Sequence, residues 1–266
     1  MKHILSFSGG KDSTFLLLEL IRRKYPLDEV VFFDTGWEFP VMYEHIEKCK
    51  KICEEHGIKF VTLHPEKPFD YLMFDHVTKS GKCGYSWCGG NCRWGTTYKT
   101  QALDKYFAEN GGAVEYIGIA ADETARLEKK RAEYNRFPLA EWGATEADCL
   151  KGCYNAGFDW GGMYEHLDRL SCKFCKNKNL KELRNIRKYY PDVWEELKER
   201  QTMTEHPLKS NMCYGNVFDL EKRFAFEDER TAAGLSITSR EFYSMLKKIL
   251  EATSDHPTEK GGETDA

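Results

Sequence analysis

The segment from Ser8 to Ser13 joins two glycines, a lysine, an aspartate and two serine hydroxyls. Apolar runs on either side of it predict a strand before the segment and a helix after it. At a glycine turn between a strand and a helix, backbone N–H groups and the positive end of the helix dipole point at one place. The segment therefore predicts a phosphate site, in which Lys11 adds positive charge and Asp12 holds a Mg²⁺ ion carried by the phosphates.

This loop differs from the other common phosphate loop, Walker A, which needs a glycine, four residues and then Gly-Lys-Ser/Thr. Here Asp12 follows Gly10-Lys11, and Leu5 stands where the first glycine would be. The pattern instead resembles the pyrophosphate loop (PP-loop) of the adenine-nucleotide α-hydrolase superfamily, whose members cleave ATP between the α and β phosphates. An ordinary Gly-Gly turn is the alternative. The resemblance implies ATP and Mg²⁺ as cofactors and a nucleotide-binding set of Ser8, Gly9, Gly10, Lys11, Asp12 and Ser13.

Two more polar loops follow predicted strands. Asp34 and Thr35 come after the apolar run at 30–33, where a carboxylate and a hydroxyl can reach a ribose or an adenine edge. A glycine turn that begins the next helix is the alternative reading. Asp34-Thr35-Gly36 resembles the Asp-Thr-Gly segment of the phosphoadenylylsulfate (PAPS) reductase family, and the loop from Gly118 to Arg126 resembles a family segment that lies against the nucleotide. The resemblance adds Asp34, Thr35, Gly118 and Arg126 to the nucleotide site.

Two cations follow a cysteine pair in the segment from Cys88 to Lys99. Arg93 and Lys99 suit phosphate or sulfate oxygens, and arginine can grip them through two parallel hydrogen bonds. Solvated charges at a helix start are the alternative. The segment resembles the cysteine-rich Arg-Trp-x-Thr-x-x-x-Lys stretch of PAPS-reductase-like proteins, and we assign the catalytic charges to Lys11, Asp12, Arg93 and Lys99.

The spacing of four cysteines predicts a metal site. A Cys-x-x-Cys pair places two thiolates in one turn, and a second pair far away in the chain completes a four-sulfur set. Sulfur ligation alone does not separate Zn²⁺ from a [4Fe–4S] cluster, so both remain open, with the cluster favoured. Cys153 is a rival ligand, and core or surface filler is the simpler interpretation of Cys49, Cys53 and Cys149. The predicted ligands are Cys88, Cys92, Cys172 and Cys175.

Alternating apolar runs and helical patterns must position these loops. Strands are expected at 4–7, 30–33, 59–63 and 115–120, and helices at 14–24, 40–56 and 96–110. This alternation predicts an α/β fold with a Rossmann-like (HUP-type) doubly wound, mostly parallel sheet and a helical, cysteine-bearing C-terminal part. The expected later helices cover 145–157, 180–190, 191–201 and 239–252. The predicted organisation is a PP-loop domain at 1–144, a helical region at 145–252 packed on it, and a disordered tail at 253–266.

Composition limits the class of protein. The chain has 266 residues, of which 41% are hydrophobic and 31% charged, and its formal net charge is −4. We expect a cytoplasmic protein without a membrane span, because the apolar runs are short. Ten cysteines in a reducing compartment are better explained as metal or catalytic ligands than as disulfides.

The resemblance to the PAPS-reductase-like branch extends from residue 3 to about 201, with two departures. A working reductase carries a Glu-Cys-Gly-x-His segment near its C-terminus, whereas the late cysteine here is Cys213 in Asn-Met-Cys-Tyr-Gly. Cluster-bearing reductases of adenylylsulfate also use adjacent cysteines, which this chain lacks. The leading hypothesis is therefore an ATP pyrophosphatase that activates an acceptor for sulfur transfer, as in nucleic-acid thiolation or phosphorothioation. A sulfite-forming reductase and a non-catalytic nucleotide- or nucleic-acid-binding module with structural zinc are the alternatives.

The expected partners follow from that hypothesis. A run of basic residues from Arg169 to Lys188 suggests a track for a nucleic-acid backbone, although a solvated helix face is the commoner explanation of such a run. A sulfur donor such as a cysteine desulfurase would supply the sulfur. A homo-oligomer is also compatible with the sequence.

Overall fold

The computed structural model describes residues 1–87, 92–130, 132–204 and 206–253. These residues form two compact units, which divide between Trp194 and Glu195. The tail expected at 253–266 falls, after Thr253, outside the described residues. The division expected at residue 144 stays a prediction, but residues 145–194 belong to the first compact unit.

The first unit is built on a five-stranded sheet with the order β3-β2-β1-β4-β5. Every pairing is parallel, and Leu5 of β1 lies between Val30 of β2 and Tyr116 of β4. The central strands read as apolar runs because both of their faces are buried. The expected α/β class and parallel sheet are confirmed. The strands are β1 (Lys2–Phe7), β2 (Glu29–Phe33), β3 (Lys59–Leu63), β4 (Ala113–Ile117) and β5 (Asn135–Arg136).

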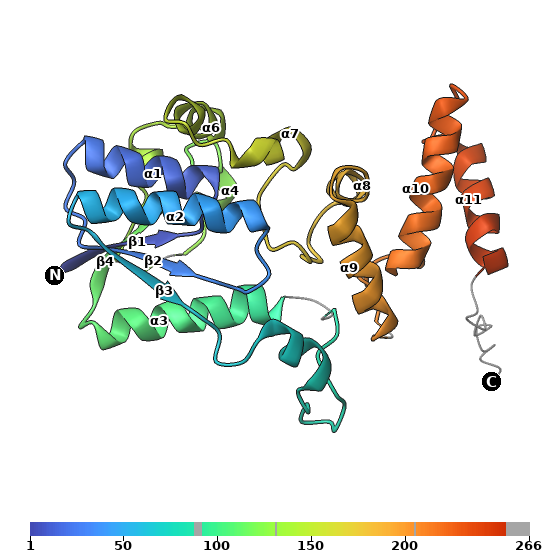
Figure 1. The fold of residues 1–266 in the computed structure, drawn as a ribbon, viewed down its shortest axis with the longest axis horizontal. Coiled ribbons are helices and arrows are strands. Elements are labelled where there is room, and N and C mark those ends of the chain that lie inside the picture. Colours follow the sequence, from blue (N-terminus) through green and yellow to red (C-terminus); the bar gives the residue numbers. More distant parts are fainter. Residues whose placement is uncertain (88–91, 131, 205, 254–266) are drawn as a thin grey trace. The chain divides into compact units, whose positions relative to one another are not determined.

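Helices cover the two faces of this sheet. The α1 and α2 helices lie on one face and α3 lies on the other (Figure 1). On the first face α6 packs along α1, so a helix from beyond residue 145 completes the layer. A small cluster of Ile4, Val31 and Phe107 joins the sheet to α3. The bounds are α1 (Lys11–Arg22), α2 (Pro40–Glu55), α3 (Lys99–Glu109) and α6 (Glu146–Asn155).

Shorter elements carry the connecting loops of the first unit. The π-helical turns η1 (Tyr71–Asp75) and η2 (Arg93–Tyr98) precede α3, so the helix expected at 96–110 begins as a wider turn. The strand expected to reach residue 120 ends at Ile117, which leaves Gly118 in the loop. The remaining elements are α4 (Thr124–Leu127), α5 (Pro138–Glu141), η3 (Trp160–Gly162), α7 (Met163–His166) and α8 (Leu180–Tyr189).

The start of α6 shows how local sequence fixes a helix end. Thr145 accepts a hydrogen bond from the backbone N–H of Asp148, and the Asp148 carboxylate accepts one from the N–H of Thr145. This reciprocal capping box satisfies two N–H groups that the helix itself leaves unpaired. It fixes where α6 begins, and therefore where Glu146 stands.

The second unit is helical. The α9 helix (Pro191–Thr202) crosses the division between the units, and α10 (Val217–Ala232) and α11 (Arg240–Thr253) follow. Phe226 and Phe242 stack at 5.4 Å between ring centroids, and Leu246 and Leu250 complete their cluster. Helices α9 and α11 were predicted from the sequence, but α10 was not. In the part of the chain that is described, every helix is too short or too polar to cross a bilayer.

Candidate nucleotide site

The loop from Ser8 to Ser13, here called the nucleotide loop, turns the chain from β1 into α1. Gly9 has a φ of +76°, in the left-handed region that favours glycine, and a Cβ there would lie 2.8 Å from the end of the Met42 side chain. Ser13 closes the turn: its hydroxyl lies 3.0 Å from the Ser8 hydroxyl and donates to the Gly10 carbonyl at 3.1 Å. The N-cap position of α1 is Gly10, which supplies no side-chain cap. No N-cap side chain therefore occupies the backbone donors in the first turn of α1, although the Tyr164 hydroxyl accepts from one of them, the Lys11 N–H.

Three side chains from a distant segment hold the backbone of this loop. The Trp160 indole donates to the Gly9 carbonyl at 2.9 Å. The Lys11 backbone N–H donates to the Tyr164 hydroxyl at 2.8 Å, and the Cys153 thiol donates to the Lys11 carbonyl at 3.3 Å. These roles could not be predicted from the sequence, because no local pattern connects residues more than 140 positions apart in the chain.

The side chain of Lys11 is paired with two carboxylates. Its ammonium lies 3.0 Å from Asp12 and 2.6 Å from Glu146, the first residue of α6. Burial by itself lowers the pKa of Lys11, but the hydrogen bonds and charges of Glu146 and Asp12 outweigh it and raise that pKa. Burial raises the pKa of Asp12 in spite of the neighbouring ammonium. Lys11 is therefore held as a cation within a cluster of net negative charge.

The exit of β4 touches the start of α1. A Cβ added to Gly118 would lie 3.0 Å from the backbone nitrogen of Ser13 and 3.1 Å from the carbonyl carbon of Asp12. A methyl group there would require the backbone of Asp12 and Ser13 to move by a few tenths of an ångström, which backbone does less readily than the end of a flexible side chain. Gly118 thus sets how closely two loops at the same edge of the sheet approach each other.

A cavity of about 400 Å³ opens at this edge, between β1 and β4 and beside the start of α3. The chain order of the strands reverses between these two strands, which is where doubly wound sheets bind ligands. Five residues of the predicted nucleotide and catalytic sets line it together: Ser8, Ser13, Lys99, Gly118 and Arg126. Its other polar walls come from residues that the sequence analysis did not select: Ser6, Thr100, Asp104, Glu115, Tyr134 and Asn135.

Two cations face this cavity with different surroundings. Arg126 pairs with Glu123 at 2.5 Å, with about half of its side chain exposed. Burial lowers the pKa of Lys99, and the nearby Glu38 carboxylate and Cys172 thiol oppose that shift. Lys99 therefore lines the cavity and also lies near Glu38, in the loop after β2, and near Cys172. Arg93 is exposed and lies over the Tyr85 ring at 5.0 Å, outside the lining of the cavity.

Asp34 and Thr35 have local partners. The Asp34 carboxylate accepts from the Gly36 N–H at 2.8 Å and from the Tyr43 hydroxyl at 3.0 Å. The Thr35 hydroxyl donates to Glu38 at 2.8 Å. Neither residue lines the cavity, so their predicted part in nucleotide binding stays a prediction.

The segment from Arg169 to Lys178, here called the cysteine loop, brings half of the predicted metal ligands together. A hydrogen bond from Cys172 and the nearby Lys178 charge lower the pKa of Cys175 to about 5, while the same hydrogen bond and burial raise the pKa of Cys172. The Lys178 ammonium donates to the Ser171 hydroxyl at 2.9 Å. Such a thiol–thiolate pair is suited to a metal, because thiolates are the ligand form.

In the other half of the predicted metal set, Cys92 is the member that the structure describes. The Cys92 thiol accepts from the Gly95 N–H at 3.3 Å and caps η2. Cys88 lies outside the described residues. Among the residues that are described, no three His, Cys, Asp or Glu side chains stand close enough to share a metal ion. The metal site therefore stays a prediction.

Four other cysteines are core residues of the first unit. Cys49 and Cys53 of α2 and Cys149 and Cys153 of α6 are fully buried. Burial raises the pKa of all four thiols, to about 12 for Cys53 and Cys153. They are neutral at physiological pH, which agrees with the filler reading of Cys49, Cys53 and Cys149.

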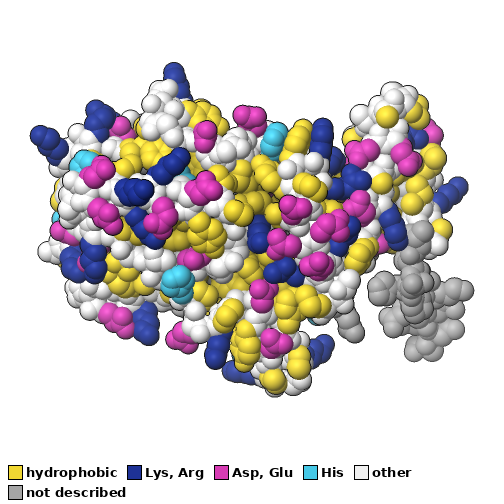
Figure 2. Space-filling view, in the orientation of Figure 1, with side chains coloured by type: hydrophobic (Ala, Val, Ile, Leu, Met, Phe, Trp, Pro, Cys, Tyr) yellow, Lys and Arg dark blue, Asp and Glu magenta, His cyan; other side chains and the backbone are white. Residues whose placement is uncertain are grey.

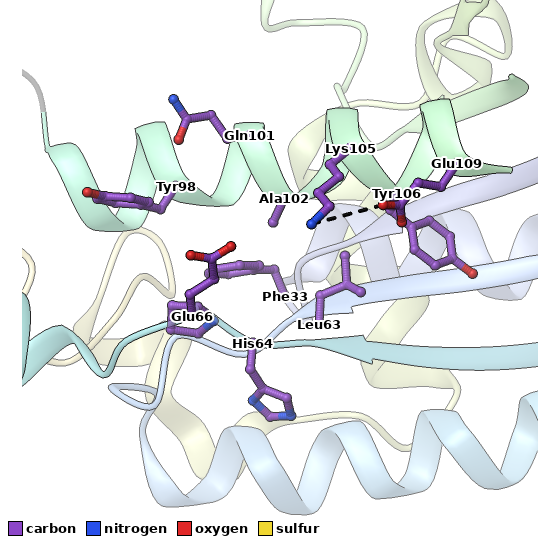
Figure 3. A pocket seen from close by; sticks show the side chains of 11 residues that line it. Phe33, Leu63, His64, Glu66, Tyr98, Gln101, Ala102, Lys105, Tyr106 and Glu109 are labelled. Atoms are coloured by element: carbon purple, nitrogen blue, oxygen red, sulfur yellow. Dashed lines mark ion pairs between the residues drawn. The ribbon is translucent and has the colours of Figure 1, made fainter. Parts of the chain in front are cut away.

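A second hollow, of about 330 Å³, lies between α3 and the ends of β2 and β3. Figure 3 shows Phe33 and Leu63 at its base, with Lys105 reaching in from α3 and pairing with Glu109. Tyr98 borders this hollow while the next residue, Lys99, borders the cavity at β1 and β4. The start of α3 therefore separates the two hollows.

Comparison with known proteins identifies the family of this chain. The model of the phosphoadenosine phosphosulfate reductase domain matches residues 2–147. The chain is 27% identical over 229 residues to the uncharacterized protein MJ0066 of Methanocaldococcus jannaschii, and 26% identical over 259 residues to MJ0973 of the same organism. These alignments cover 80% and 92% of the chain but 43% and 54% of the relatives.

A phage protein is similar as well. The uncharacterized nin region protein ORF290 of Escherichia phage lambda is 28% identical over 204 residues, which is 69% of this chain and 68% of that protein. The chain spans about half the length of the two archaeal relatives. The matched domain ends close to Glu146, so the side chains of Cys153, Trp160 and Tyr164 that hold the nucleotide loop lie beyond it.

Proposed function

The chain belongs to the phosphoadenosine phosphosulfate reductase domain family, and on that premise we propose that it is a PP-loop ATP pyrophosphatase. It binds ATP and Mg²⁺ at the carboxyl edge of the sheet and cleaves the bond between the α and β phosphates. The adenylate activates an acceptor for sulfur transfer. This role agrees with a site built of backbone donors and cations, which stabilise phosphate charge.

One observation carries the proposal: residues from three of the predicted segments line one cavity. Ser8 and Ser13 come from the loop after β1, Gly118 and Arg126 from the loop after β4, and Lys99 from the start of α3. The cavity volume of about 400 Å³ falls in the range of small-molecule sites. Backbone N–H groups at the start of α1 would bind the diphosphate of ATP. The loops that follow the strands would bind its nucleoside.

The proposed chemistry is two displacements. An acceptor oxygen attacks the α phosphorus, the bond to the bridging oxygen of the β phosphate breaks, and pyrophosphate leaves with that electron pair. The nucleotide loop and the cations Lys99 and Arg126 stabilise the charge on the departing diphosphate. The terminal sulfur of the donor's persulfide then attacks the activated carbon or phosphorus of the acceptor and expels AMP. A second thiol of the donor protein attacks the remaining sulfur–sulfur bond, forms a disulfide with the donor cysteine and leaves the transferred sulfur on the acceptor. Mg²⁺, bound to the phosphates and held by Asp12, would neutralise charge in the first step.

We favour a nucleic acid as acceptor and a persulfide-carrying protein, such as a cysteine desulfurase, as sulfur donor. The basic run is the support: Arg169, Lys181 and Lys188 are exposed on the first unit. Figure 2 shows basic and acidic side chains interspersed on the face in view, so charge on that face does not form a broad basic field. A thiolate-ligated zinc or [4Fe–4S] site at Cys172 and Cys175, completed by Cys88 and Cys92, stays part of the proposal.

The test is to identify the products of ATP in the presence of Mg²⁺ and candidate acceptors. We expect AMP and pyrophosphate, and Asp12→Asn should lower their formation about 10²–10³-fold, the usual cost of one charge-stabilising group. Glu47→Gln, on the exposed side of α2, is the matched control and should retain activity. ADP and phosphate as products would contradict the proposal. Sulfite released from an adenylylated sulfate would instead identify a reductase.

A further inference from the structure

The ammonium of Lys11, which is outside the lining of the cavity, is paired with two protein carboxylates in the loop where we propose that a diphosphate binds. We propose that Glu146 competes with the diphosphate for Lys11, so that Lys11 exchanges Glu146 for phosphate on binding and returns to it when pyrophosphate leaves. This inference rests on the proposed function and assigns Glu146 a positioning role in pyrophosphate release.

The charges in this cluster favour an exchange. Lys11 contributes one positive charge, and Asp12 and Glu146 contribute two negative charges within 3.0 Å of its ammonium. In this arrangement the side chain of Lys11 adds no net positive charge to the nucleotide loop. A diphosphate, with several negative charges of its own, is attracted fully by Lys11 only when one of the carboxylates withdraws.

The exposure of the two carboxylates shows which one withdraws. The side chain of Asp12 is 20% exposed and follows Lys11 directly in the first turn of α1. The side chain of Glu146 is 47% exposed and stands at the first position of α6. Glu146 can therefore turn into water with little change in hydration, whereas Asp12 would remain beside the amine.

The backbone of the loop does not have to move in this exchange. Trp160 binds the Gly9 carbonyl, and Tyr164 and Cys153 bind the two backbone groups of Lys11. Tyr164 is half-buried and packs edge-on against Trp160 at 4.9 Å, which holds its hydroxyl in place. Only the side chains of Lys11 and Glu146 need to change partners.

The experiment is calorimetric titration of the full chain with inorganic pyrophosphate in buffer free of Mg²⁺, so that metal ligation does not contribute. Glu146→Gln should bind pyrophosphate about tenfold more tightly than wild type, because a charge-assisted bond of the competing kind is worth about that factor. Glu165→Gln, an exposed carboxylate on α7, makes the same change of net charge and should bind as wild type. In turnover assays, Glu146→Gln should show stronger inhibition by pyrophosphate.

Each outcome decides between the readings. Unchanged or weaker pyrophosphate binding in Glu146→Gln overturns the exchange, as does equal tightening in Glu165→Gln, which would indicate a general charge effect. A wild-type chain that binds no pyrophosphate overturns the proposed function and the exchange together.

Tyr164→Phe should weaken pyrophosphate binding about threefold through a looser loop, within the usual range for one hydrogen bond. Tighter binding in that variant would show that Tyr164 competes with the ligand and is not a fixed support.

Discussion

The nucleotide loop and the cysteine loop both belong to the first unit, but they are built in different ways. In the nucleotide loop the proposed phosphate donors are consecutive backbone groups, so six residues contain the proposed anion site, and distant side chains support its backbone. The cysteine loop supplies Cys172 and Cys175, and a four-sulfur site needs two more ligands from another segment. A site made of contiguous backbone can be recognised from sequence, whereas a site shared between segments depends on the fold.

The largest effect on ATP turnover expected in this comparison comes from the contact between Gly118, just after β4, and the nucleotide loop. Gly118→Ala would place a methyl group against the backbone of Asp12 and Ser13, at 3.0 to 3.1 Å from their atoms. The neighbouring backbone must give by a few tenths of an ångström, whereas displacement of a reacting group by about 1 Å can cost about 10²-fold in rate. We therefore expect ATP turnover to fall about threefold to tenfold, measured as pyrophosphate release.

Gly57→Ala is the control for that variant. Gly57 has open space around its Cβ position and a φ of +69°, so alanine there strains the backbone at a distance from the cavity. It should lower the free energy of unfolding and leave the turnover of the folded enzyme unchanged. Equal turnover in the two glycine variants would show that the contact between β4 and α1 has no part in positioning the loop.

A smaller effect concerns the histidine beneath the nucleotide loop. His45 lies 2.9 Å from the Thr14 hydroxyl and 4.6 Å from Trp160 between ring centroids, and burial lowers its pKa to about 4. The unfolded chain, with a histidine pKa near 6.5, binds a proton between these values that the folded chain does not. Stability therefore falls as pH falls through this window, by about 2 kcal/mol for this residue between pH 7 and pH 5.

Denaturant unfolding at the two pH values measures this loss. His45→Gln, which cannot take up the proton, should lose less stability than wild type by that amount. The same pH dependence in both proteins would contradict the assignment. The expected result would show that the support of the nucleotide loop depends on a neutral His45. The cysteine loop differs, because its thiol pair depends on charge.

The smallest effect expected is on the thiols of the cysteine loop. The hydrogen bond from Cys172 is the largest cause of the low pKa of Cys175, about 5, so Cys172→Ala should raise that pKa. Alkylation by iodoacetamide, followed by peptide mass spectrometry in chelator-treated protein, would show the reaction of Cys175 moving to higher pH. Cys83→Ala, at an exposed cysteine, should leave the profile unchanged. A midpoint that does not move in Cys172→Ala would exclude the thiol–thiolate pair.

Much of the first unit was predictable because its signals are local. Apolar runs and helical periodicity gave β1 to β4 and the main helices, since burial on both faces of a parallel sheet leaves a simple pattern. β5 was missed, because a strand of two residues carries no periodicity. The α10 helix was missed although Asn216 caps it and its buried residues repeat with helical spacing, so that signal was present in the sequence.

The candidate site was predictable to a similar extent. Ser8, Ser13, Lys99, Gly118 and Arg126 were chosen from loops that follow strands or begin helices, and parallel strands bring such loops to one edge. Arg93 was chosen by the same reasoning and lies over Tyr85 instead. Position along a segment does not reveal the direction of a side chain, which depends on how η2 is wound.

The sequence by itself determined the parallel α/β architecture and the glycine turn between β1 and α1, because both follow from the order of residues over short distances. Only the tertiary structure decided that Glu146 holds Lys11, that Tyr164 and Trp160 fix the turn, and that four cysteines fill the core. These contacts join segments far apart in the chain. Their formation depends on how helices pack on the sheet, and the free energy of that packing is a property of the whole unit.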